Sequence, residues 1–90
     1  MKENDKFVLE VLGREIRHWR INHFLWTQEE LAERSGLTRN QISLIENGAK
    51  DIRITTLRNI AQAFGMTVSR LTKFKLFSNE QIFYNKRERF

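Results

Sequence analysis

The sequence predicts a small all-α domain, and three observations support this fold class. Apolar residues recur at spacings of three and four, as they do on the buried stripe of a helix. Glycines at positions 36, 48 and 65 separate the helical stretches. Two of the helix starts carry a complete capping signature. We therefore expect one domain of five helices over residues 1–72, followed by a short aromatic and basic tail over residues 73–90.

The composition limits the classes of protein to consider. The 90 residues include no cysteine, which excludes a disulfide framework and a thiolate zinc site. Apolar runs such as Phe7-Val8-Leu9 end after three residues, so we expect no signal peptide, no membrane span and a cytoplasmic protein. The formal charge of +5 suits a polyanionic partner, but it is also an ordinary solubility charge. A chain this short buries only a small core, which makes dimerisation a reasonable expectation.

The first helix is expected from about Lys6 to Asn22. Phe7, Ile16 and Trp19 lie on one apolar stripe of this helix. Gly13 lies inside it and costs up to about 1 kcal/mol relative to alanine.

Two short helices joined by a tight turn follow. Thr27 and Glu30 form a capping box before one helix, and Thr38 and Gln41 form the same box eleven residues later. Gly36 lies between them, where it can take the positive φ that reverses the chain. This spacing describes a helix-turn-helix.

The rest of the domain is predicted from two further glycines. Gly48 ends the third helix, and Gly65 ends a fourth helix that begins after a loop over residues 49–53. Thr67 can cap a fifth helix. The inward-facing residues of these two helices are Leu57, Ile60, Ala61, Phe64, Val68 and Leu71.

The tail holds half of the ten aromatic residues and +3 of the net charge. It is too apolar for a disordered segment, and its secondary structure stays open between helix and strand. Its aromatic residues cover the protein's own core, form a dimer interface, or bind a second protein.

The third helix, Thr38 to Glu46, has one polar and one apolar face. At 100° per residue, Ile42 and Ile45 fall on the apolar face. The opposite face carries Arg39, Asn40, Ser43, Leu44 and Asn47. Arginine reads guanine, asparagine reads adenine, and an aliphatic group contacts the thymine methyl. The alternative interpretation is the solvated face of an ordinary bundle helix.

Three motifs resemble one known family. Thr27-Gln28-Glu29-Glu30-Leu31-Ala32, Gly36-Leu37-Thr38 and Ile42-Ser43-x-x-Glu46-Asn47-Gly48 are similar to the Xre, or lambda-repressor-like, helix-turn-helix regulators of bacteria and phages. The resemblance extends from about Leu12 to Leu71. It implies a homodimer that binds an inverted-repeat operator in double-stranded DNA and usually represses, often at its own promoter.

The resemblance also implies roles for single residues. Base-reading positions fall on Arg39, Asn40, Ser43 and Leu44 of the helix that Thr38 opens, and backbone-binding positions fall on Thr27, Gln28, Asn47 and Lys50. Arg20 and Glu46 match a structural ion pair of the family. That pairing agrees with the helical wheel, which puts Glu46 at the core boundary, where an unpaired carboxylate is costly.

The chain departs from the family pattern between the first two helices. The stretch from Ile16 to Gln28 is one residue longer than expected, and Leu25 stands where glycine is frequent. This puts the entry angle of the second helix in question. Phe24 and Trp26 in this stretch are either core residues or part of a partner surface.

Within the family, two stretches are most similar to controller proteins of restriction-modification systems, which switch between activation and repression of their operon. They are residues 51–57 and 65–68. The alternative role is an antitoxin that binds DNA and docks a toxin through the tail. A third reading, from a different class, is an RNA-binding or chaperone-like adaptor that uses the basic tail.

No residue set predicts an enzyme, a metal site or a cofactor site. His18 and His23 are five residues apart and lie on different faces of a helix. Ser43 has no base beside it in the sequence pattern. Glu29, Glu30 and Glu33 are most simply surface residues that the helix dipole favours.

Overall fold

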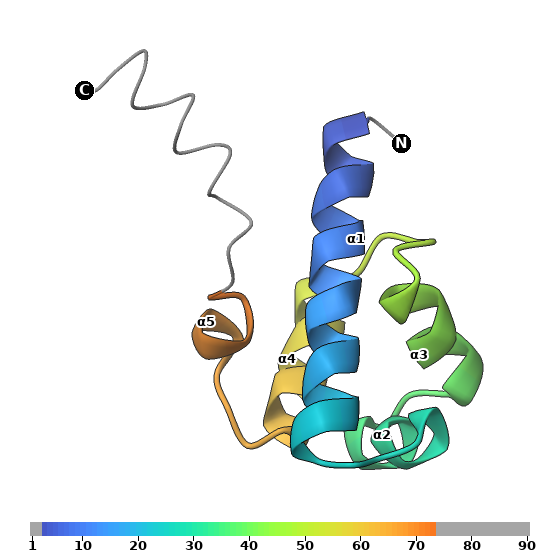
Figure 1. The fold of residues 1–90 in the computed structure, drawn as a ribbon, viewed down its shortest axis with the longest axis vertical. Helices are drawn as coiled ribbons and strands as arrows, with labels where there is room; N and C mark the ends of the chain where they lie inside the picture. The colour runs from blue at the N-terminus through green and yellow to red at the C-terminus, as the bar shows by residue number, and fades with distance from the viewer. Residues whose placement is uncertain (1–2, 74–90) are drawn as a thin grey trace.

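A computed structural model describes residues 3–73, which form five α-helices and one π-helical turn. The elements are α1 (Glu3–His18), η1 (Trp19–His23), α2 (Gln28–Ser35), α3 (Arg39–Glu46), α4 (Ile54–Ala63) and α5 (Val68–Leu71). In Figure 1, α1 stands between α3 and α5, and α2 lies across its lower end. The described part of the chain contains no strand. The predicted all-α, five-helix class is confirmed.

The first helix differs from its predicted bounds of Lys6 and Asn22. It begins earlier, at Glu3, and its α-helical bonding ends at His18, where η1 begins. In this turn the Phe24 N–H donates to the Trp19 carbonyl, five residues back, at 3.2 Å. A π turn closes its hydrogen bond over one residue more than an α turn does.

The chain from η1 into α2 contains the one non-glycine residue with positive φ in residues 3–73. Leu25 has φ of 56°, and its side chain is 82% exposed. The rings on either side of it face inward: Phe24 stacks on Trp26 at 4.5 Å and on Phe64 of the α4 C-cap at 5.2 Å. Both pack against the core, which decides between the two interpretations of Phe24 and Trp26 in favour of the core.

The helix-turn-helix forms where the capping signals placed it. Thr27 and Thr38 are the N-caps of α2 and α3, and both capping boxes are complete. Gly36 is the C-cap of α2 with φ of 75°. The Leu37 N–H donates to the Ala32 carbonyl at 2.9 Å and closes the turn. Thr67 caps α5 as predicted.

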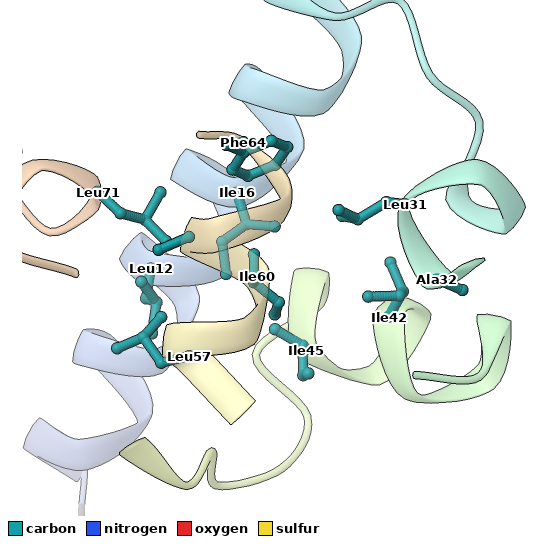
Figure 2. Close-up of a cluster of buried hydrophobic side chains, with 11 residues drawn as sticks. Leu12, Ile16, Leu31, Ala32, Ile42, Ile45, Leu57, Ile60, Phe64 and Leu71 are labelled. Carbon is teal, nitrogen blue, oxygen red and sulfur yellow. The ribbon is translucent and has the colours of Figure 1, made fainter. Parts of the chain in front are cut away.

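The core lies where α1, α2, α3 and α4 meet (Figure 2). α3 packs on both α1 and α2, and α4 packs on α2 and α5. The buried cluster comprises Leu12, Ile16, Leu31, Ala32, Ile42, Ile45, Leu57, Ile60, Ala61, Phe64 and Leu71. Because α2 and α3 both contribute to it, the core holds the helix-turn-helix rigidly against α1 and α4.

None of the helices within residues 3–73 is long and apolar enough to cross a membrane. Beyond Lys73, the predicted tail lies outside the described residues, and with it the three interpretations of its aromatic residues.

Candidate nucleic-acid interface

α3 presents a polar face to solvent and an apolar face to the core. The side chains of Ile42 and Ile45 are buried. The predicted reading residues lie on the other face: Arg39 and Asn40 are exposed, as is Asn47 at the C-cap, while Ser43 and Leu44 are half-buried. Among residues 3–73, no hydrogen bond occupies the Arg39 guanidinium or the Asn40 amide. These groups are free to meet a ligand that lies along α3.

The two capping threonines hold the starts of α2 and α3. The Glu30 N–H donates to Thr27 Oγ1 at 3.0 Å, and the Gln41 N–H donates to Thr38 Oγ1 at 3.1 Å. In these bonds each hydroxyl acts only as an acceptor, so its own proton remains available to an anion outside the protein. Both residues are exposed.

A buried ion pair joins the end of α3 to the chain that enters α2. Arg20 Nε and Nη2 donate to the two carboxylate oxygens of Glu46 at 2.6 and 2.9 Å, in the bidentate geometry that arginine favours. The two side chains are only 8% and 1% exposed. Arg20 Nη1 also donates to the Trp26 carbonyl at 2.8 Å. One guanidinium therefore fixes η1, α3 and the entry into α2 relative to one another.

Gln28 completes this network at the first residue of α2. Its Nε2 donates to Glu46 Oε1 at 3.1 Å. The amide nitrogen carries a second N–H, which this bond leaves free. The Gln28 side chain is half-buried and bonded to the buried carboxylate.

The loop after α3 adds positive charge along the side of the helix that carries Gln41 and Ile45. Lys50 and Arg53 are exposed and line an open groove of about 530 Å³ that α3 borders through Gln41 and Ile45. Asp51 lines the same groove, and its Oδ1 accepts the Ile52 N–H at 2.9 Å.

The sequence analysis did not single out Arg53, which is the N-cap of α4. No side chain caps this helix, whereas threonine caps α2, α3 and α5. The first N–H groups of α4 therefore lack the side-chain partner that threonine gives to α2, α3 and α5. What distinguishes Arg53 in the sequence is an arginine at the N-cap position, where those three helices have threonine.

The remaining candidates form no other site. His18 and His23 do not lie on different faces, as their spacing predicted for an α-helix. Their ring centroids are 5.6 Å apart, because a π turn brings residues five apart onto the same side. The His18 Nδ1 contacts the Asn22 amide at 2.8 Å. Within the described residues, no three histidine, aspartate or glutamate side chains lie close enough to hold a metal ion. Glu30 serves the α2 capping box, and Glu29 and Glu33 are exposed.

Comparisons with known proteins match the same helix-turn-helix region. The helix-turn-helix family model HTH_3 matches residues 16–71. The control protein C.SmaI of Serratia marcescens is 35% identical over 75 residues, which cover 82% of this chain and 87% of that protein. A hypothetical transcription factor of Neisseria meningitidis is 32% identical over 74 residues, covering 77% of this chain and 69% of the relative. The control protein C.BamHI of Bacillus amyloliquefaciens is 29% identical over 69 residues, which cover 77% of this chain and 85% of that protein.

No solved structure matches the chain significantly. The family match spans more than half of the sequence and contains α2, the turn and α3, which the structure shows as a complete helix-turn-helix. The chain therefore belongs to the Xre-type helix-turn-helix family of DNA-binding transcription regulators.

Proposed function

We propose that this regulator binds an inverted-repeat operator as a homodimer and places α3 in the major groove. The observation that carries the proposal is the outer face of α3, where Arg39 and Asn40 are exposed and have no partner within residues 3–73. A major groove about 12 Å wide admits one α-helix. Two copies related by a two-fold axis would read half-sites about 34–36 Å apart, or a multiple of that distance.

Four side chains of α3 supply the proposed base contacts. Arg39 suits the O6 and N7 acceptors of guanine, and Asn40 suits the N6 and N7 groups of adenine. Ser43 can donate to or accept from either kind of base edge, and the half-buried Leu44 offers a methyl contact to thymine.

A second set of residues supplies the proposed backbone contacts. They are Thr27, Gln28, Thr38, Asn47 and Lys50, and we add Arg53 at the start of α4. Such contacts position a protein on the duplex without reading its sequence. Gln28 is the best supported of them, because its bond to Glu46 fixes the amide while one N–H stays free.

The similarity to two control proteins supports a controller-type role, in which the protein regulates its own operon together with a neighbouring gene. The alternative, an antitoxin that docks a toxin, depends on the tail beyond the described residues, and no observation on residues 3–73 favours it.

Two substitutions test the proposed base and backbone contacts, and each removes one positive charge. Binding is measured on an operator duplex that the wild-type protein has selected from random DNA. Arg39→Ala should cost about 1–3 kcal/mol of operator binding and relax the preference at one base pair. Lys50→Ala should weaken binding to every DNA alike and lower the salt slope by about 1. Fluorescence anisotropy over a salt series measures both effects. Equal losses on operator and random DNA for Arg39→Ala would contradict the assignment of α3 as the reading helix.

The homodimer is tested by light scattering on the full chain. The proposal predicts a mass of twice 10.8 kDa at the protein concentrations that saturate the operator. A monomer that binds both half-sites independently would contradict it.

A further inference from the structure

Gly13 lies where the backbone of α3 meets α1 more closely than any side chain allows. A Cβ at this position would lie 2.4 Å from the Ile45 carbonyl oxygen and 2.5 Å from that of Glu46. Ordinary van der Waals contacts of a Cβ begin at 3.4 Å. Both obstructing atoms belong to the backbone, so no side-chain rotation can make room, and only a hydrogen fits.

A second glycine, in the turn that follows α3, makes a similar close approach to α1. A Cβ on Gly48 would lie 2.9 Å from the Cα of Glu10. Gly48 also has φ of 66°, which favours glycine independently of space. We name the contact of Gly13 and Glu10 with the last residues of α3 and Gly48 the α1–α3 seam.

The seam and the buried ion pair act on the same end of α3. The ion pair ties this end to Arg20 of η1, and Gly13, about two helical turns before Arg20, allows the backbones of α1 and α3 to meet. A Cβ at position 13 would require the end of α3 to move by roughly 1 Å while the ion pair still holds Glu46. The helix would therefore tilt rather than move away as a unit.

We propose that Gly13 is a positioning residue for DNA recognition, because its missing side chain sets where α3 stands relative to α1. The inference rests on the proposed function of α3. Glycine within a helix is unfavourable relative to alanine, so local propensity does not explain its presence here. Binding groups must be held within roughly 0.5 Å of their productive positions, and the displacement of roughly 1 Å that a Cβ requires exceeds that tolerance.

The test compares glycine-to-alanine variants of the full chain. Gly13→Ala obstructs the seam without a positive φ. Gly48→Ala obstructs the seam and strains the backbone. Gly65→Ala is the matched control for Gly48→Ala, because Gly65 has a similar φ of 72° but no atom within 4 Å of its Cβ, so alanine there strains the chain and displaces nothing.

The readout is the ratio of affinities for the operator and for a scrambled duplex of equal length and composition, at one salt concentration. Each variant is measured at a temperature where circular dichroism shows it fully folded. We expect this ratio to fall about tenfold or more for Gly13→Ala and Gly48→Ala, since specific sites bind on the order of 10³-fold tighter than bulk DNA. Gly65→Ala should keep the wild-type ratio.

The outcomes distinguish failure of this inference from failure of the proposed function. If Gly13→Ala and Gly48→Ala lose stability but keep the same operator-to-scrambled affinity ratio as Gly65→Ala, the seam has only a structural role and the inference is overturned. A wild-type ratio near one would instead overturn the proposed function, and the inference with it. A Gly13→Ala chain that stays unfolded leaves the decision to Gly48→Ala against Gly65→Ala, whose backbone strain is alike.

Discussion

The connection that enters α2 and the connection that leaves it differ in almost every physical respect. The exit from α2 is a short turn in which Gly36 takes the positive φ and Thr38 caps the next helix. The entry runs through a π turn and through Leu25, which holds a positive φ of 56° with an exposed leucine side chain. The exit is stabilised by local bonds, whereas the entry is held by tertiary contacts.

Those tertiary contacts explain why the chain keeps the unfavourable positive φ of Leu25 in the connection into α2. Arg20 bonds to Glu46 of α3 and to the Trp26 carbonyl at once. The rings of Phe24 and Trp26 stack toward Phe64, and the Arg34 guanidinium covers Trp26 at 4.4 Å from its centroid. Strained backbone lasts only where the surrounding structure determines it, and here that structure also positions α2 and α3.

The largest effect on the free energy of unfolding should come from breaking the ion pair that holds the connection into α2. Arg20→Ala leaves the Glu46 carboxylate buried with only the Gln28 amide, and we expect a loss of about 3–5 kcal/mol in the free energy of unfolding. Urea denaturation measures it. As a control, Arg20→Met with Glu46→Leu should cost less than the single change, because no unpaired charge remains. A loss below about 1 kcal/mol for Arg20→Ala would contradict the account.

A matched pair of substitutions should move stability in opposite directions at the two connections. Gly36→Ala meets no neighbouring atom and adds only backbone strain, so it should cost about 1–2 kcal/mol. Leu25→Gly removes the same kind of strain and should gain about 0.5–1 kcal/mol after the added freedom of the unfolded chain is counted. Thermal unfolding compares the two.

Leu25→Ala separates backbone strain from the exposed side chain. It shortens the side chain but keeps the Cβ, so it should leave stability nearly unchanged. A gain equal to that of Leu25→Gly would mean that exposure of the leucine, rather than its φ, is the unfavourable feature of the entry.

The smallest effect on the free energy of unfolding should come from removing the Arg34 guanidinium, which lies over the Trp26 ring. Arg34→Ala removes the contact with Trp26 and should cost about 0.5–1 kcal/mol. Glu33→Ala, at the exposed neighbouring position, should change stability by less. If both variants unfold at the wild-type temperature, Arg34 does not support the entry.

The same contrast explains which parts of the molecule the sequence predicts. α2, the turn and α3 were predictable because a capping box is a local pattern of two side chains and two N–H groups. The length of the entry indicated that something differed there, but the π turn and the role of Leu25 depend on contacts with α3 and α4. Gly13 looked only unfavourable, since its close neighbours, Ile45 and Glu46, are more than thirty residues away.

The candidate site follows the same division. The exposed face of α3 came from helical periodicity alone, whereas Gln28 and the Arg20–Glu46 pair were expected only through the family resemblance. Arg53 was missed because its position at the uncapped start of α4 is a property of the folded loop.

The most direct test of the central claim, that α3 reads an operator, is a selection of genomic fragments by the purified full chain at near-physiological salt. The account predicts enrichment of one inverted repeat, bound on the order of 10³-fold or more tighter than bulk DNA. Uniform, salt-sensitive binding to all fragments, with no repeat enriched, would contradict it.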